Sequence, residues 1–179
     1  MPPDLKDESK KATLLARYRS TLQRHPLLGN CVQSALISAC ADTFKQRFVS
    51  KEPFSVRSVL RQAFLMAFVN TPTAWCIYGM YDRLKLGVAA KLFLDQAVLC
   101  WFTNSLSMAV LHALNSRPLS ALPERVKSGE LMRVVVASWK VWLPAKAVMF
   151  GLVPPVWRFL YQSCVAFGWQ IILSLMLNN

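Results

Sequence analysis

The feature that most constrains this chain is a series of five long apolar stretches, separated by proline and charged residues. A helix needs about 20 mostly apolar residues to cross the hydrocarbon core of a bilayer, and each stretch reaches that length. Apolar residues make up 54% of the chain, whereas soluble domains average about 45–50%. We therefore predict an all-α integral membrane bundle with four to five spanning helices. The stretches are Leu27–Phe48, Val59–Tyr81, Gly87–Leu114, Leu131–Val153 and Pro155–Leu177.

The segment before the first stretch has a different character. It opens with a polar tail, after which Leu14, Leu15, Tyr18 and Leu22 fall on one helical face. This pattern predicts a short amphipathic helix lying in the membrane interface. We accordingly divide the chain into a polar tail with an interfacial helix (residues 1–25) and a transmembrane helical bundle (residues 26–179). The acidic residues of the tail argue against a cleaved mitochondrial presequence, so we expect any organelle address to be internal.

Polar residues interrupt the third stretch at helical spacing. Gln96, Cys100, Thr103 and Ser107 follow one another at steps of four, three and four residues, so they share one face of a helix. Polar groups at membrane depth are costly and normally face a bundle interior or water. The spacing therefore predicts a bundle with a polar interior.

The carboxylates within these stretches are expected to follow the same rule. Ser34, Ser38 and Asp42 form a stripe on the first stretch, and Asp95 precedes the stripe on the third. We predict that Asp42 and Asp95 point inward and that each meets a cationic or amide partner, because a lone buried carboxylate is costly. A second interpretation places them near helix ends, where they reach the headgroups.

The fourth stretch carries tryptophans, a lysine and a proline within one helix. Trp139, Trp142 and Lys146 lie on a single face, and Pro144 predicts a bend because it removes a backbone donor. If an aqueous path follows this face, the Lys146 ammonium is expected to attract anions. If the path is closed, a carboxylate must neutralise it, and Asp42 and Asp95 are the candidates.

Charge and residue types exclude several classes of protein. The net charge is +12, but the basic residues are spread over all the connections and no nucleic-acid-binding motif is present, so we expect contact with anionic lipid headgroups and not with nucleic acid. No nucleophile elbow or phosphate loop occurs, which argues against an enzyme. Five cysteines without a CxxC pair, and only two histidines, predict no metal site, cofactor or disulfide framework. We expect the cysteines to be buried as small apolar residues.

Several short motifs resemble the Mpv17/PMP22 family of small integral proteins of peroxisomal and inner mitochondrial membranes. The segments that carry the resemblance are "YRSTLQRHP", "ADTFKQ", "PTAWCIYGMYDR", "KLFLDQ" and "WKVWLPAKAVMFGLVP", followed by Arg158 and "GWQIILS". The likeness extends from about Tyr18 to Ser174. The chain departs from the family pattern at four positions, where a glycine, a tryptophan, a glutamine and an asparagine are replaced by Ala41, Ile77, Lys146 and Met149.

The resemblance implies a helical bundle that acts as a weakly selective channel for small solutes, with no known catalytic residues. It implies the mitochondrial inner membrane or, alternatively, the peroxisomal membrane. A second interpretation is a structural accessory subunit of a larger inner-membrane complex, such as a respiratory or ATP synthase assembly. The residues predicted to line a pore or the bundle interior are Asp42, Gln46, Pro72, Asp95, Gln96, Trp139, Trp142 and Lys146.

Overall fold

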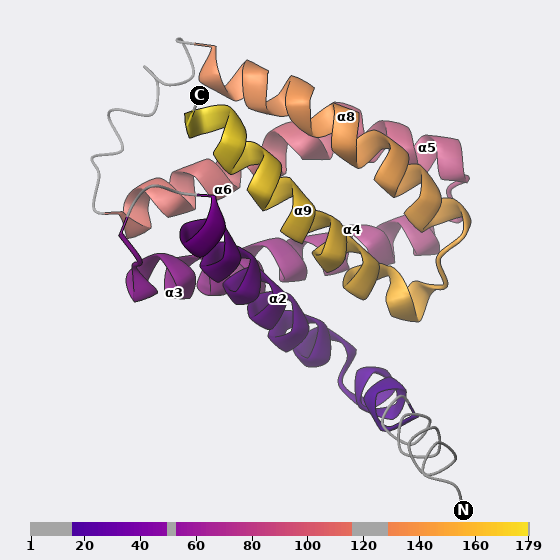
Figure 1. The fold of residues 1–179 in the computed structure, drawn as a ribbon. Coiled ribbons are helices and arrows are strands. Elements are labelled where there is room, and N and C mark those ends of the chain that lie inside the picture. Colours follow the sequence, from indigo (N-terminus) through magenta and orange to yellow (C-terminus); the bar gives the residue numbers. More distant parts are fainter. Residues whose placement is uncertain (1–15, 50–52, 116–128, 179) are drawn as a thin grey trace, which may run out of the picture.

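The computed structural model describes residues 16–49, 53–115 and 129–178, and within these ranges the chain is helical apart from short connections. No described residue belongs to a strand, which confirms the all-α prediction. Residues 16–24 of the expected interfacial helix are helical, whereas the polar tail lies outside the described residues. The elements (Figure 1) are α2 (Pro26–Phe48), α3 (Val56–Phe64), the π-helix η1 (Leu65–Asn70), α4 (Thr71–Arg83), α5 (Val88–Leu94), the π-helix η2 (Asp95–Leu99), α6 (Cys100–Leu114), α8 (Glu130–Gly151), the 3₁₀ helix η4 (Pro155–Trp157) and α9 (Arg158–Asn178).

Proline sets the boundaries of several of these helices. Pro26 occupies the first turn of α2, and Pro155 opens η4, where a missing N–H group costs nothing. The Pro154–Pro155 pair thus separates α8 from α9, as expected. Pro144 lies inside α8, and the helix continues through it. The bend expected at Pro144 stays a prediction.

The helical stretches close into a ring. α2 packs against α3 and α9, α9 packs against α8, α8 packs against α5 and α6, and α6 packs against η1. Each stretch therefore contacts the next one along the chain, and the last stretch returns to the first. Figure 1 shows α2 and α9 side by side although they lie at opposite ends of the sequence.

Hydrogen bonds between small and polar side chains hold the contact between α2 and α9. Ser34 shares a hydrogen bond of 3.1 Å with Ser163, and the Gln170 amide donates to the Ser38 hydroxyl over 3.1 Å. The two α2 serines are 2% and 3% exposed. The stripe predicted on the first stretch is therefore buried against the last helix, where small side chains let helices approach closely.

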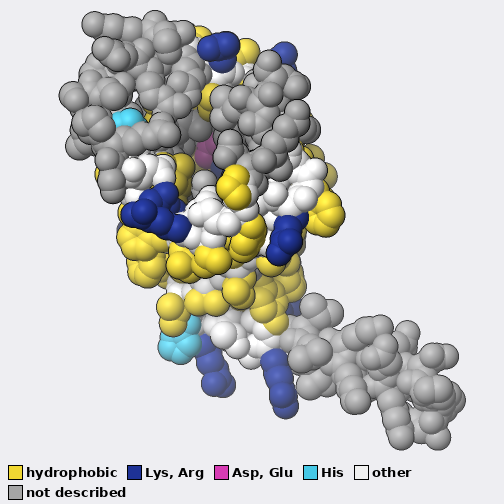
Figure 2. All heavy atoms as spheres, turned by 60° about the vertical axis from the view of Figure 1, so that its left-hand side comes forward, with side chains coloured by type: hydrophobic (Ala, Val, Ile, Leu, Met, Phe, Trp, Pro, Cys, Tyr) yellow, Lys and Arg dark blue, Asp and Glu magenta, His cyan; other side chains and the backbone are white. Residues whose placement is uncertain are grey.

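The distribution of side chains is inverted relative to a soluble protein. Leu28, Leu36 and Phe93 are each more than 60% exposed, whereas Asp42 is fully buried and Lys146 is 6% exposed. Figure 2 shows the exposed hydrophobic side chains as a band across one face, with Lys and Arg side chains above and below it. Such a band suits the hydrocarbon core of a bilayer, and basic residues at its edges suit the headgroups.

Two helical stretches meet the length and hydropathy of a bilayer-crossing helix: Val88–Leu114 and Met132–Gly151. The larger count of four to five spanning helices stays a prediction. Three of the five cysteines, Cys40, Cys76 and Cys164, are exposed, so the expectation that all would be buried was wrong. A small apolar side chain can face lipid as readily as it can face a protein core.

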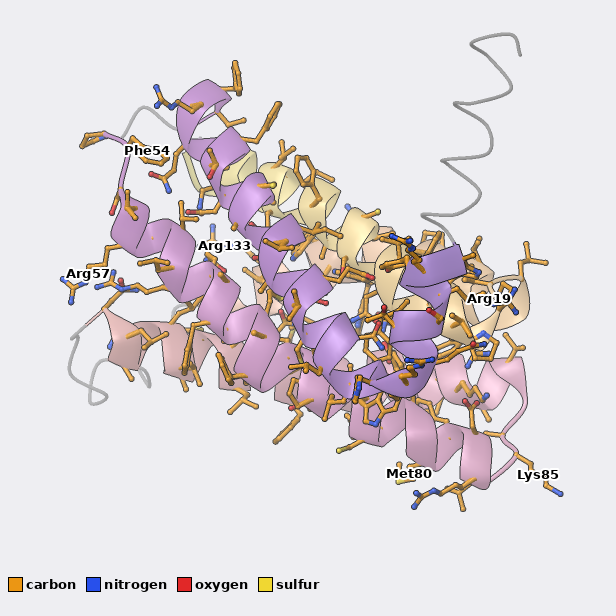
Figure 3. The ribbon with its side chains drawn as sticks, turned by 90° about the horizontal axis from the view of Figure 1, so that it is seen from below. Arg19, Phe54, Arg57, Met80, Lys85 and Arg133 are labelled. Atoms are coloured by element: carbon orange, nitrogen blue, oxygen red, sulfur yellow. The ribbon has the colours of Figure 1, made fainter. Side chains whose placement is uncertain are left out.

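Basic residues mark both ends of the bundle. In Figure 3 Arg57 lies at one end, near Phe54, and Arg19 and Lys85 lie at the other. The positive-inside rule depends on a difference between the two sides. Because basic residues lie at both ends, this rule does not predict which end of the bundle faces which side of the membrane.

Candidate functional site

A cavity of about 270 Å³ lies within the ring of helices. The second to fifth helical stretches line it, whereas no residue of α2 is among its described lining. Its polar lining includes every polar residue of the stripe predicted on the third stretch, and two of the cavity residues carry charge. The polar lining residues are Gln62, Asn70, Tyr78, Asp95, Gln96, Cys100, Thr103, Asn104, Ser107, Lys146, Gln162 and Gln170.

Two π-helical turns bring polar residues to this cavity. η2 carries Asp95 and Gln96, which are neighbours in sequence and which both line the cavity. A π-turn is wider than an α-turn and often marks a functional site. η1 carries Asn70 and ends two residues before Pro72, whose ring would clash with the preceding turn of a regular α-helix. The wider turn of η1 relieves that clash.

Lys146 and Asp95 form a buried ion pair at the cavity wall. The Lys146 Nζ lies 3.3 Å from a carboxylate oxygen of Asp95, and the two side chains are 8% and 10% exposed. Lys146 also donates a hydrogen bond to the Tyr78 hydroxyl. Of the two candidate partners, the structure thus selects Asp95 and leaves Asp42 elsewhere. Lys146 is neutralised and does not stand in the cavity as a free cation.

Aromatic rings surround the same ammonium. The Lys146 Nζ lies 4.8 Å from the ring centroid of Tyr78, 5.6 Å from that of Trp142 and 5.9 Å from that of Phe150. Contacts of this kind contribute about 0.5–2 kcal/mol each, more when water is excluded. Together with Asp95 they fix the position of the charge.

Hydrogen bonds extend from the ion pair in both directions. The Gln96 amide donates to the second carboxylate oxygen of Asp95 over 2.9 Å, and the Tyr78 hydroxyl donates to Gln162 over 2.8 Å. The chain of side chains therefore runs from η2 through α8 and α4 to α9. Four helical stretches thus share one polar network.

A cluster of aromatic and apolar side chains lies next to the ion pair. Tyr78, Tyr81, Met149, Phe150 and Phe159 pack together, and each is at most 6% exposed. They come from α4, α8 and α9, and Tyr78 belongs both to this cluster and to the described lining of the cavity.

Beyond the aromatic cluster, Asp82 joins three helices. Its carboxylate lies 2.5 Å from the Lys91 Nζ and 3.4 Å from an Arg158 guanidinium nitrogen. Burial raises the pKa of the Asp82 carboxyl, but the hydrogen bond and charge of Lys91 and the charge of Arg158 outweigh it, so the pKa lies below its ordinary value. These contacts fasten α4, α5 and α9 at this end of the bundle.

Asp42 and Gln46 lie together away from the cavity. The Gln46 amide donates to Asp42 over 2.6 Å and to the Ser55 carbonyl over 3.2 Å, and its oxygen accepts from the Ser55 N–H over 2.6 Å. Lys45 also pairs with Asp42. The prediction that Asp42 and Asp95 are buried with cationic or amide partners is therefore confirmed, and the Asp42 group serves to hold the start of α3 against the end of α2.

The other predicted residues are divided between the cavity and its surroundings. Asp95, Gln96, Trp142 and Lys146 line the cavity. Trp139 is 36% exposed, and its indole N–H donates to the Gln96 carbonyl over 3.1 Å, so it supports η2 from outside. Pro72 follows η1 and is not among the described lining residues, and Asp42 and Gln46 line the interface of α2 and α3.

Sequence reasoning missed several cavity residues. Asn70, Tyr78, Gln162 and Gln170 line the cavity but were not predicted as site residues. The glutamines of α9 lie eight residues apart with Ala166 midway, a spacing that keeps them close to one helical face. That spacing is the signal that could have identified them.

The described residues show no group of three or more His, Cys, Asp or Glu side chains placed to hold a metal ion. The described lining supplies hydrogen-bonding side chains, the thiol of Cys100 and the Asp95–Lys146 ion pair.

Comparisons with known proteins show which proteins the chain resembles. Residues 112–174, which include α8 and most of α9, match the model of the Mpv17/PMP22 family. The chain is 28% identical over 165 residues to PXMP2/4 family protein 3 of Dictyostelium discoideum, covering 89% of this chain and 88% of the relative. The chain is thus similar to members of the Mpv17/PMP22 family.

Two further relatives are similar to the chain over nearly its whole length. The peroxisomal membrane protein PMP22 of Arabidopsis thaliana is 27% identical over 172 residues, covering 92% of this chain and 90% of the relative. The mitochondrial inner membrane protein Mpv17 of Caenorhabditis briggsae is 23% identical over 166 residues, covering 90% and 91%. No solved structure shows a significant match to the chain. The region that matches the family model supplies Trp142, Lys146 and Gln162 to the cavity.

Proposed function

We propose that the protein is a channel-like integral membrane protein of the mitochondrial inner membrane or the peroxisomal membrane, weakly selective for small solutes. The observation that carries this proposal is a cavity whose lining includes many polar side chains, between helices whose outer faces are apolar. Relatives named for these two membranes support the location.

The position of the cavity supports a role in passage across the membrane. The two helical stretches that qualify as spans, Val88–Leu114 and Met132–Gly151, carry Asp95 and Lys146. Buried polar groups are costly in an apolar surrounding unless they are hydrogen-bonded, and at membrane depth they typically serve a solute path. A purely structural bundle would be more stable with an apolar interior.

The aromatic cluster bears on how a solute path could continue from the cavity. A path toward Asp82 would have to pass the packed rings of Tyr81, Phe150 and Phe159. Passage on that side would require these rings to separate, and the contacts of Asp82 with α5 and α9 hold that end together.

Adjacent residues of α6 allow a matched test. Thr103 lines the cavity, whereas Phe102 is 54% exposed on the outer face of the same helix. Thr103→Trp should fill part of the cavity and lower solute efflux from liposomes that contain the purified protein by severalfold. Phe102→Trp should leave efflux unchanged, because it replaces one lipid-facing ring by another. Equal efflux from the two variants would refute a path through the cavity.

A cysteine in the cavity wall provides an independent test. Cys100 lines the cavity, and its Sγ lies 3.3 Å from the Ser138 hydroxyl. In a variant that keeps Cys100 as its sole cysteine, a small water-soluble methanethiosulfonate reagent should react and reduce efflux. Efflux that is absent from wild-type liposomes would instead refute the channel. Co-migration with a large complex on native gels would then favour the accessory subunit.

A further inference from the structure

We propose that the outer face of α8 around Lys140 binds a membrane-spanning helix of a different protein, and that this helix carries an Asp or Glu near the middle of the bilayer. Lys140 is exposed and is not among the described lining of the cavity, so the contact is separate from the solute path proposed above. Three observations carry it: the depth of Lys140, the lack of a partner for its charge, and the paired state of the described carboxylates.

Lys140 lies near the middle of a helix that is long enough to cross a bilayer. The span runs from Met132 to Gly151. At 1.5 Å per residue, Lys140 lies about 12 Å inside a hydrocarbon core that begins at Met132. Its side chain is a zigzag of five single bonds, which reaches only about 6 Å toward the headgroups. The ammonium therefore remains within the core even when the side chain is fully extended.

α8 lies at the edge of the bundle (Figure 1), and the surroundings of Lys140 on its outer face are apolar. Val136 lies one turn before it and Leu143 one turn after it, and each is more than 40% exposed. No side chain within the described ranges forms a hydrogen bond or an ion pair with Lys140. Charged groups at this depth are costly in lipid and normally face protein or water, where they pair with one another. Lipid tails therefore leave this charge without the partner that it needs.

The backbone of the same turn also lacks its usual hydrogen bond. In a regular helix the N–H of residue 144 donates to the carbonyl of Lys140, but Pro144 has no N–H. Pro144 is itself exposed on the outer surface of α8. Polar side chains of neighbouring helices often supply such a donor where proline interrupts a helix in the membrane. One turn of α8 thus presents both an unpaired ammonium and a carbonyl deprived of its regular donor.

The partner is a different protein, because this chain offers no free carboxylate at that depth among its described residues. Asp42 and Asp95 are buried, and each already pairs with a lysine. Asp82 lies at the end of the bundle and pairs with Lys91. A two-fold contact between two copies through this face would bring one Lys140 against another, and like charges repel. A carboxylate from another chain would instead form a charge-assisted hydrogen bond with the ammonium.

The first test uses the purified full chain in phosphatidylcholine liposomes with two synthetic peptides. Each peptide is an apolar helix of about 20 residues with a dansyl group, and one carries glutamate at its centre where the other carries leucine. Energy transfer from tryptophan reports binding, since Trp139 is next to Lys140 in sequence. The glutamate peptide should bind at least about fivefold more tightly, the ratio expected from one polar contact between model helices in lipid. Equal binding of the two peptides overturns the proposal.

Variants of α8 assign the preference to Lys140. Lys140→Leu should remove the preference for the glutamate peptide, whereas Lys140→Arg should keep it because the charge remains. Arg133→Gln is the matched control, since Arg133 is exposed on the same helical face, two turns nearer the membrane surface. This variant should bind both peptides as the wild type does. A preference that survives Lys140→Leu, or that disappears in Arg133→Gln, overturns the role of Lys140.

Photo-crosslinking in the native membrane tests which kind of molecule covers this face. With p-benzoylphenylalanine in place of Leu143, we expect an adduct with a protein whose crosslinked span contains Asp or Glu. The adduct should disappear when Lys140→Leu is added, and it should be absent when the photoreactive residue replaces Phe102 on the outer face of α6. Adducts with lipid alone would show that the ammonium bends toward the headgroups, and adducts with a second copy would show self-association. Either outcome overturns the proposal.

Discussion

The stability of the Asp95–Lys146 pair can be tested by a double-mutant cycle. Both side chains are about nine-tenths buried, so removal of either partner leaves an uncompensated charge. Breaking a buried pair in this way costs about 3–5 kcal/mol. We expect Asp95→Asn to fall near the lower limit, because Lys146 keeps the Tyr78 hydroxyl and three aromatic rings. Lys146→Gln should fall nearer the upper limit, since Asp95 then keeps only the Gln96 amide.

The double variant should lose less free energy of unfolding than the two single variants lose in total. The two replacement side chains are both uncharged amides, and the main losses are hydrogen bonds and cation–π contacts, so we expect a cost of about 1–2 kcal/mol. The coupling energy should therefore exceed about 2 kcal/mol. The assay is unfolding in mixed micelles of rising SDS content, followed by tryptophan fluorescence. Lys140→Gln should stay within about 0.5 kcal/mol of the wild type. Additive effects of the two substitutions would refute the pairing.

Two further predictions concern the ends of the bundle. A carboxyl whose pKa is lowered on folding stabilises the fold above its unfolded pKa, about 3.9, and that contribution is lost as the pH falls through the folded-state pKa. Because Asp82 is about half exposed, its pairs with Lys91 and Arg158 contribute less than about 1 kcal/mol. When the pH is lowered from about 5 to about 2, the unfolding temperature of the wild type should therefore fall by up to about 2–4 °C more than that of Asp82→Asn. Parallel pH profiles would contradict the assignment. At the other end, Gln46→Leu should lower the free energy of unfolding by about 1–3 kcal/mol, because it leaves the buried Asp42 carboxylate without its amide donor; an unfolding curve that overlays the wild type would rule this out.

The helices and the polar stripe could be predicted because both depend on local sequence. Twenty-residue apolar stretches identify helices in lipid, and helical spacing alone places Gln96, Thr103 and Ser107 on one face. Helical spacing also identified the α2 serines, which lie against α9. Each of these predictions needs only the geometry of a single helix.

The pairing of helices could not be predicted, because it depends on the register between them. Sequence left two candidate partners for Lys146, and only the packing of α8 against η2 selects Asp95. The two π-helical turns were also missed, since they shift the face of the helix after them relative to regular spacing. Pro72, two residues after the end of η1, was a signal of the first one. The division of the predicted residues between the cavity and the interface of α2 and α3 follows from these two effects.

The contact between the first and last helices also affects how the protein is made. Ser34 meets Ser163, and Ser38 meets Gln170, across most of the length of the chain. Chains are synthesised from the N-terminus, and contacts between distant residues form late. Until α9 is present, the α2 serines therefore lack the partners that they have in the complete fold. A chain truncated before α9 cannot close the ring of helices.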